Sequence, residues 1–330
     1  MTARAKLLGV ALSTLALLAM VAVSLSVGSA LLPLSTVWES LVAPNGGIDH
    51  NTVLKVRVPR TVLAVMVGAA LAVAGAVIQA LTRNPLADPG ILGVNAGASF
   101  AIVLGVAFLG ITRVNHYLWL SFAGAVIAGI LVYAISGRGK ATPVRLTLVG
   151  VALSSVFMGV SQTLTLIDPE TFDRMRFWGA GTIADRPAGT IPAVAGFIVV
   201  GIIVALACSR SLNALALGDD LATAVGSRTA ITRTIGFAAV TLLCGAATAA
   251  AGPIAFVGLM IPHTVRWLTG PDQRWILPFT LILGPVLMLV SDVVGRLLIW
   301  PAELQVGVIT ALVGAPVLIV MVRRARTSNL

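Results

Sequence analysis

The sequence has few charged residues and lacks polar stretches long enough to form the surface of a soluble domain. Charged residues make up 10% of its 330 residues, whereas hydrophobic residues make up 58%. Soluble domains carry about 25% charged residues, because most of their surface faces water. The composition therefore predicts that membrane lipid surrounds the chain, and that residues 1–330 form a single transmembrane domain without a soluble one.

The sequence also lacks the residue groups that bind metals, nucleotides or nucleic acids. Its two cysteines, Cys208 and Cys244, have no metal-ligand spacing and are interpreted as packing residues. The GRGK segment at residues 137–140 lacks the leading glycine and the following Ser or Thr of a phosphate-binding loop. The net charge of +10 comes from small groups of Lys and Arg between hydrophobic runs, which does not suit nucleic acid. We therefore expect no catalytic residue, metal, bound cofactor or nucleic-acid partner.

Long hydrophobic runs fill most of the chain, and most are about the length that crosses a bilayer as a helix. Gly252-Pro253 divides one run that is too long for a single helix, because proline lacks an amide donor and clashes with the preceding turn. The predicted fold is all-α, with about ten transmembrane helices at residues 7–27, 61–82, 89–112, 114–137, 146–167, 187–209, 234–251, 254–268, 275–298 and 304–322.

Basic residues near both ends of the chain place both termini in the cytoplasm by the positive-inside rule. Arg4 and Lys6 precede the first run, and residues 323–326 contain three arginines. The uncharged stretch at residues 7–34 is longer than the hydrophobic part of a signal peptide, so we predict a retained helix. Cleavage after Ala30 is the alternative.

Several arginines oppose the charge bias that sets this topology. With ten crossings, Arg57, Arg60 and Arg296 lie on the outer side, so they need another explanation. Arg296 also lies four residues after Asp292, a spacing at which the two side chains can pair on one helix face.

An internal repeat relates the two halves of the chain at an offset of 177 residues. The segment Gly68-Ala69-Ala70 with Gly75 recurs as Gly245-Ala246-Ala247 with Gly252, and Pro85 falls onto Pro262. The predicted topology gives the two copies opposite directions across the membrane, which is typical of transport proteins. A coincidence in Ala- and Gly-rich helices is the alternative.

Two cytoplasmic segments are candidates for function. Residues 211–226 have leucines at near-helical spacing, an interruption at Gly218 and a possible cap at Asp219, which predicts two short helices on the membrane surface. They are either a docking element for a motor protein or a simple interfacial anchor. Residues 84–90 contain two prolines and a glycine, which predict a rigid turn. His263, a lone histidine beside a proline, is interpreted as structural.

Four stretches give the chain a family resemblance. VRVPRTVLAVMVGAALAVAGAVIQALTRNPLADPGILGVNAGASF, LNALALGDDLATAVGS, AAAGPIAFVGLMIPHTVRWLTGPDQRW and GVITALVGAPVLIV resemble the FecCD family, the permeases of iron-siderophore, haem and vitamin B12 ABC importers. Within it, LADPGILGVNAGASFAIVLG and PVRLTLVGVAL are most similar to the ferric-enterobactin branch. The Leu304-Gln305 pair departs from the Leu-Pro of many members.

The resemblance implies a type II importer permease in the bacterial cytoplasmic (inner) membrane that carries a ferric siderophore, with a catecholate as the expected type. Its implied partners are a second permease subunit, identical or related, two ATPase subunits that bind ATP and Mg, and an extracytoplasmic siderophore-binding protein. An ion-coupled secondary transporter, or a haem or vitamin B12 permease, is the alternative.

The resemblance also assigns roles to residues of this chain. Coupling to the ATPases is implied for Gly218, Asp219, Leu221, Ala222 and Gly226. The cytoplasmic gate is implied for Asn84, Leu86 and Thr142. Docking of the binding protein is implied for Arg57, Arg60 and Arg296, which would explain positive charge on the outer side.

Overall fold

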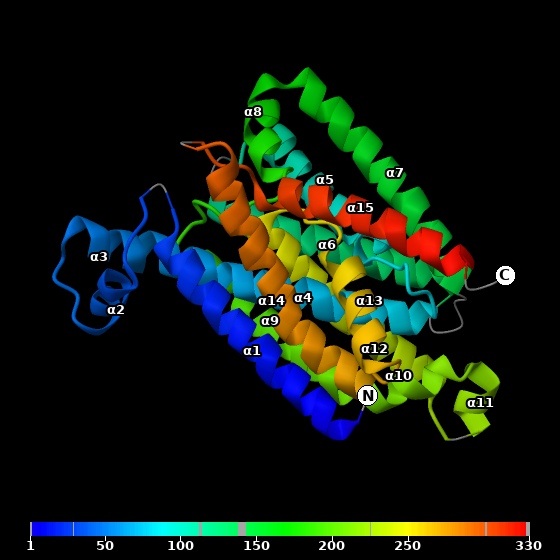
Figure 1. Ribbon diagram of the computed structural model, residues 1–330. Helices are drawn as coiled ribbons and strands as arrows, with labels where there is room; N and C mark the ends of the chain where they lie inside the picture. The colour runs from blue at the N-terminus through cyan, green and yellow to red at the C-terminus, as the bar shows by residue number, and fades with distance from the viewer. Residues whose placement is uncertain are drawn as a thin grey trace.

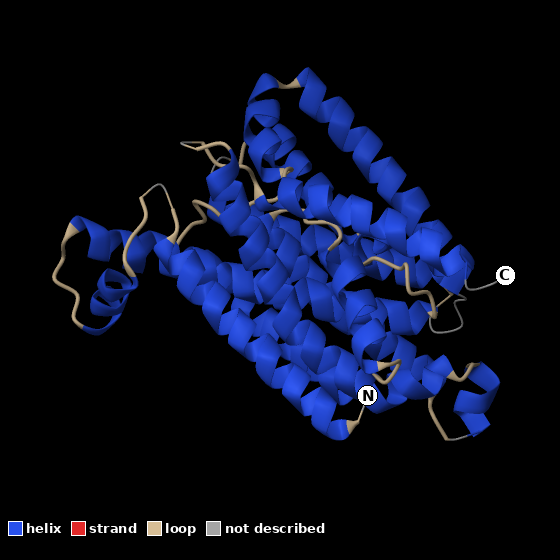
Figure 2. Ribbon diagram, viewed as in Figure 1, coloured by secondary structure: helices blue, strands red, loops and turns tan. Residues whose placement is uncertain are grey.

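The computed structural model describes residues 2–28, 30–111, 114–137, 143–224, 226–300 and 302–327. Within these ranges the regular structure is entirely helical, as Figure 2 shows. The prediction of an all-α fold is therefore confirmed.

Ten helices correspond to the predicted hydrophobic runs. They are α1 (Ala3–Ser26), α4 (Val58–Thr82), α5 (Val94–Leu109), α6 (Val114–Ser136), α7 (Pro143–Ile167), α9 (Thr190–Ala207), α12 (Thr229–Ala251), α13 (Val257–Thr269), α14 (Gln273–Leu298) and α15 (Val306–Thr327). By length and composition, seven helices in the described part of the chain can cross a membrane. The apolar parts of α5 and α15 are shorter, as is α13. The predicted number of ten crossings is therefore not confirmed.

The remaining elements are short. They are α2 (Leu34–Val42), α3 (Ile48–Thr52), the π-helix η1 (Val53–Arg57), the 3₁₀-helix η2 (Pro89–Leu92), α8 (Pro169–Trp178), α10 (Ser209–Ala216) and α11 (Asp219–Ala224). Figure 1 shows α2 and α3 at one end of the bundle and α10 and α11 at the other. The two short helices predicted within residues 211–226 are confirmed as α10 and α11, and their place on the membrane surface stays a prediction. Helices α2, α3 and α8 were not predicted.

Several predicted helix boundaries differ from the observed ones. At two of them glycine interrupts the backbone. The predicted helix at residues 89–112 is divided, because Gly93 adopts a left-handed φ of 75° between η2 and α5. The predicted helix at residues 254–268 begins later, at Val257, because residues 252–256 are not helical and Gly252 has a φ of 77°. The predicted division at Gly252-Pro253 is itself confirmed.

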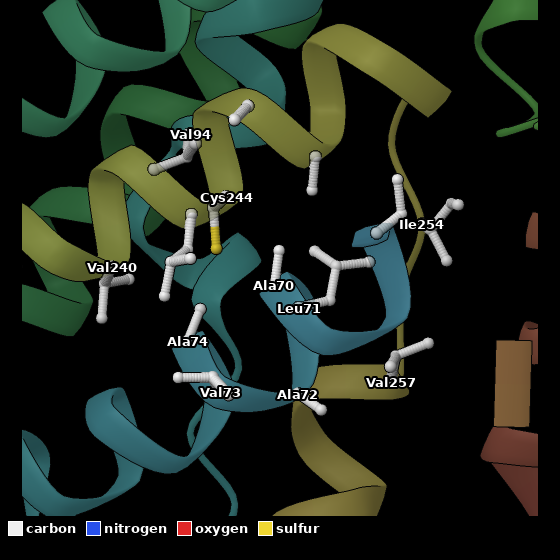
Figure 3. Close-up of a cluster of buried hydrophobic side chains, with 14 of the residues drawn as sticks. Ala70, Leu71, Ala72, Val73, Ala74, Val94, Val240, Cys244, Ile254 and Val257 are labelled. Atoms are coloured by element: carbon white, nitrogen blue, oxygen red, sulfur yellow. The ribbon is translucent and has the colours of Figure 1, made fainter. Parts of the chain in front are cut away.

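The core forms around α4, which packs against α12, α13 and α14. Many of the facing residues are small, and Figure 3 shows Ala70 and Ala74 of α4 on the side of Cys244 in α12, with Ala72 on the side of Val257 in α13. Small side chains let helix backbones approach closely, which increases van der Waals contact between membrane helices. Cys244 is fully buried, in agreement with its interpretation as a packing residue.

Glycines make the closest contacts of α4. A Cβ atom on Gly75 would lie 1.9 Å from the carbonyl oxygen of Gly258 in α13. A Cβ on Gly68 would lie 2.7 Å from the carbonyl oxygen of Gly284 in α14. In the second copy of the repeat, a Cβ on Gly245 would lie 3.2 Å from Ala125 in α6. These positions therefore accept little or no side chain.

We predict that Gly75→Ala destabilises the protein, because the added methyl group would overlap backbone atoms that cannot move away independently. Overpacking of this kind typically costs about 1–3 kcal/mol. The matched control is Gly196→Ala in α9, where no atom lies within 4 Å of the new Cβ. Alanine there should raise helix stability by up to about 1 kcal/mol. Thermal unfolding of both variants in the same detergent measures the difference, and equal midpoints would contradict the prediction.

Candidate functional site

Residues after α4 form a non-helical turn before η2, as predicted for residues 84–90. Arg83 ends α4 in a left-handed conformation with φ 51°. The side-chain oxygen of Asn84 accepts a hydrogen bond of 2.9 Å from the Leu86 amide, and the Asp88 carboxylate accepts one of 2.7 Å from the Gly90 amide. Both bonds fix the backbone without a helix or sheet, which is typical of Asx turns.

This turn is also attached to α13. The His263 ring is hydrogen-bonded to the backbone of Pro85, and packs edge-on against Trp267. One turn before the end of α4, the Gln79 side-chain amide donates to the carbonyl oxygens of Gly258 and Leu259, at 3.3 and 3.1 Å. The end of α4, the turn and the start of α13 are therefore connected.

Asn84 and Leu86, the predicted gate residues, both lie on this turn and are exposed. Asn84 also lines a cavity of about 280 Å³ with Thr147 and Leu148 of α7. Thr142, the third predicted gate residue, lies outside the described residues. The gate assignment stays a prediction, and the structure places one of its residues, Asn84, beside the first turns of α7.

The segment with α10 and α11 has two different faces. Leu212 and Leu215 are buried against the bundle, whereas Leu217 and Leu221 are 56% and 59% exposed. Gly218 turns the chain between α10 and α11 with a φ of 99°, as the predicted interruption requires, so the leucines on its two sides do not share one face. Leu217 and Leu221 therefore form an exposed apolar pair on the segment with α10 and α11.

The predicted coupling residues occupy distinct positions in this segment. Ala222 is buried, and its amide donates to the Gly218 carbonyl, so Gly218 is the residue that precedes α11. Asp219 is the first residue of α11, and its carboxylate does not act as the expected cap. Instead it accepts hydrogen bonds from Arg83 at 3.1 Å and from Arg233 of α12 at 2.8 Å. Gly226 ends the segment at a φ of 82°.

A second contact attaches α10 to the start of α14. The Asn213 side chain donates to Asp272 at 2.6 Å and accepts from the Gln273 amide at 2.8 Å. Hydrogen bonds from Arg274 and from Asn213 lower the pKa of Asp272 to about 2. The carboxylate is therefore charged at neutral pH, where it caps α14.

The three predicted docking arginines come together at the opposite end of the bundle. Arg57 donates to the carbonyl oxygens of Leu25, Ser26 and Ala30 at 2.8, 2.7 and 2.6 Å. Arg296 donates to those of Ser24 and Val27 at 2.9 and 2.7 Å. Most of these oxygens belong to the last turn of α1, whose carbonyls have no partner inside the helix. The two arginines therefore cap α1.

Carboxylates balance the charge of this arginine cluster. Asp292, which is 2% exposed, accepts hydrogen bonds from Arg296, as the four-residue spacing predicted, and from Arg60 at 2.8 Å. Arg60 also pairs with Glu303 at 2.7 Å. Arg57 and Arg296 are 4% and 3% exposed, so their charge is directed into this chain. Their docking role stays a prediction, and Arg60 lines two cavities at this end.

Sequence reasoning placed one more cation, Arg186, on the outer side but assigned it no role. Arg186 follows Asp185, which has a left-handed φ of 52°, and it lines two adjoining cavities of about 450 and 630 Å³. Its Nε donates to the Thr182 carbonyl, and its buried Nη2 has no acceptor within the described ranges. Burial lowers the pKa of Arg186 to about 10, which still leaves it charged at neutral pH.

Comparison with known proteins decides the family. The sequence profile of the FecCD transport family matches residues 16–324. The chain belongs to the FecCD transport family. It is 50% identical over 305 residues to the ferric enterobactin transport system permease protein FepD of Escherichia coli K12, covering 92% of this chain and 91% of that one. It is 34% identical to the hemin transport system permease protein HmuU of Yersinia pestis, covering 92% and 91%.

A solved structure has the same fold. An inward-facing structure of a metal-chelate type ABC transporter superposes with a TM-score of 0.83 at 29% identity, covering 96% of this chain and 98% of that one. The FecCD fold therefore extends over nearly the whole chain. Together with its seven long apolar helices, this makes the chain an integral membrane protein.

Sequence reasoning assigned Asp219 in this FecCD chain but missed its partners. Arg83 and Arg233 were interpreted only as basic residues on the cytoplasmic side. They lie 136 and 14 positions away from Asp219 in the chain, so the sequence did not suggest that they pair with it. No local pattern predicts an ion pair over such separations. The cap that Arg57 and Arg296 form on α1 was missed for the same reason, since Arg296 is 272 positions from its acceptor on Ser24.

We predict that Asp292→Asn strongly destabilises the protein, because it leaves the buried Arg296 without its charged partner. Removing one member of a buried ion pair costs about 3–5 kcal/mol. The control is Glu303→Gln, which removes a carboxylate that is 35% exposed and should cost no more than about 1 kcal/mol. Thermal unfolding in detergent compares the two variants. A loss for Asp292→Asn no larger than that for Glu303→Gln would show that this cluster is not a structural cap.

Proposed function

We propose that this FecCD-family chain is the permease subunit of an ATP-driven ABC importer. Its cargo is a ferric siderophore of the catecholate type, which a binding protein delivers and which passes into the cytoplasm. The observation that carries this proposal is 50% identity to a ferric enterobactin permease over nine-tenths of both chains. The superposition on a metal-chelate type ABC transporter supports the same function.

The proposed topology has ten crossings of the bacterial inner membrane, with both termini in the cytoplasm. Two features support it: all ten predicted runs have a helix, and α2 and α3 lie at the opposite end from α10 and α11. Glycine packing supports the inverted repeat, because α4 meets α14 at Gly68 and α12 meets α6 at Gly245. At the offset of 177 residues Gly68 corresponds to Gly245, so α4 and α12 each use the same repeat position for a close contact with another helix.

Three kinds of partner subunit complete the proposed importer. Two ATPase subunits, which hold ATP and Mg, dock on α10 and α11, where Leu217 and Leu221 are exposed. A second permease subunit, identical or related, covers part of α7, which has exposed apolar residues at Val151, Val156 and Met158. The binding protein docks at the end that holds Arg60, with Arg57 and Arg296 supporting that surface from inside.

Two alternatives remain as outcomes of experiments. A haem permease is favoured by the 34% identity to a hemin permease, and direct uptake assays with both cargoes separate it from the siderophore permease. An ion-coupled secondary transporter is the alternative of a different class, which an inverted repeat would also fit. The source of energy separates this alternative from the ABC importer.

We predict that siderophore uptake by cells that depend on this permease stops with vanadate and continues with an uncoupler. Vanadate blocks ATP hydrolysis by ABC proteins, whereas an uncoupler removes the ion gradient that a secondary transporter needs. Uptake of radiolabelled ferric enterobactin is measured after each of the two treatments, vanadate and the uncoupler. As the control, cellular ATP is held constant. Uptake that survives vanadate and stops with the uncoupler would replace the ABC importer by the secondary transporter.

We predict that Leu221→Arg reduces transport and leaves the fold intact, because the side chain is exposed on α11, the proposed docking surface for the ATPase. The matched control, Leu221→Met, keeps an apolar side chain of similar volume and should transport normally. Ala222 is unsuitable for this test, because it is buried and a larger residue would disturb the fold. Co-purification of the ATPase and uptake measure the effect. Normal co-purification and uptake in Leu221→Arg would exclude this face as the docking surface.

A further inference from the structure

The Asp219 carboxylate lies between arginines from two other parts of the chain. Arg83 Nη2 is 3.1 Å from its Oδ1, and Arg233 Nη2 is 2.8 Å from the same oxygen and 3.0 Å from Oδ2. Arg83 is the last residue before the turn at Asn84, and Arg233 lies in the first turns of α12. One carboxylate therefore joins α11 to both α4 and α12.

The backbone on both sides of this contact is held in an unusual conformation. Arg83 has a φ of 51°, which costs a non-glycine residue about 1 kcal/mol or more and persists only where its surroundings hold it. Across the contact, Gly218 has a φ of 99°, and a Cβ there would lie 3.7 Å from Arg83 Nη1. The guanidinium group of Arg83 therefore lies beside the turn that precedes α11.

The contact leads within three residues to the proposed gate. Arg83 is followed by Asn84, whose side chain holds the Leu86 amide, and by Pro85, which is hydrogen-bonded to His263 of α13. Because these bonds make the turn rigid, a displacement of Arg83 moves Leu86 with it. A displacement of α11 is carried to Arg83 by the charge of Asp219.

The strength of the contact suits a link that changes during transport. The side chains of Arg83 and Asp219 are 36% and 47% exposed. Exposed ion pairs contribute only about 0–1 kcal/mol to stability, so losing this one should not unfold the protein. The side chain of Arg233 is only 11% exposed, so its ion pair with Asp219 is the more protected of the two. This pair keeps Asp219 on α12 when Arg83 separates from it.

We propose that Asp219 and Arg83 form the ionic link through which α11 controls the turn at residues 84–90. This rests on the proposed function, because α11 is taken as the element that an ATPase moves and Leu86 as part of the gate. Asp219 and Arg83 are positioning residues: they do not touch cargo or nucleotide, but they set where Leu86 lies. No local pattern in the sequence joins these two residues, and the contact exists only in the folded chain.

The test is a double-mutant cycle on the complete importer in proteoliposomes, with its ATPases and binding protein. The variants are Arg83→Gln, Asp219→Asn and the two combined, and the readout is ATP hydrolysed per siderophore delivered. Each single variant should raise this ratio about two- to fivefold, the range that an exposed ion pair supplies. The double variant should be no worse than Asp219→Asn alone, because Asp219→Asn already removes the link to Arg83.

Three controls separate the link from a general loss of structure. Arg83→Lys keeps the charge and should retain most of the coupling. Arg228→Gln removes an exposed arginine five residues before Arg233, and should leave the ratio unchanged. Melting temperatures of all variants should stay close to that of the parent, as expected for an exposed ion pair.

A second measurement follows the gate itself. A cysteine at position 86, introduced as Leu86→Cys, is exposed to a thiol reagent with and without ATP and vanadate. Its reactivity should differ between the two states in the parent and become equal when Asp219→Asn is added. A difference that survives Asp219→Asn overturns the link, and so do additive effects or unchanged ratios in the cycle. Absence of ATP-dependent uptake in the parent complex instead overturns the proposed function.

Discussion

The close approach of the α4 backbone to α13 and α14 is the constraint on which the rest of the structure depends. Gly75 contacts Gly258, and Gly68 contacts Gly284, at distances that leave no room for a methyl group. Lipid tails are as apolar as leucine, so helices in a membrane gain stability from tight packing and not from the hydrophobic effect. With α4 buried at the centre, both of its ends are fixed relative to α13 and α14, and both polar clusters form at those ends.

The two clusters differ in how much water reaches them, and this separates their roles. At the α1 end, Arg57, Arg296 and Asp292 are almost completely buried, and the arginines satisfy carbonyls that α1 cannot satisfy itself. Buried charges that are paired and hydrogen-bonded are costly to disturb. This gives positive charge at that end a structural reason, which is independent of any partner. A docking surface can still form on the rim of the same cluster, where Arg60 and Arg186 line cavities.

At the other end, the ion pairs of Asp219 are partly exposed and therefore weak. Elements that move in a transport cycle need contacts that can be exchanged at small cost, and short helices joined through glycine turns provide them. In this FecCD chain α10 is held by buried leucines and by Asn213, whereas α11 is held mainly by Ala222 and Asp219. The part of the segment with the fewest internal contacts is also the part that presents Leu221 outward.

The sequence alone determined the features that depend on residues close together in the chain. Hydrophobic runs set the helices, Gly252-Pro253 set the break before α13, and the spacing of Asp292 and Arg296 set their pairing. The motifs were sufficient to identify the FecCD family. Only the tertiary structure decided which face of α11 is exposed, which carbonyls Arg57 and Arg296 bind, and that Arg83 meets Asp219. These contacts join residues far apart in the chain, and their geometry exists only once the glycines of α4 have brought the helices together.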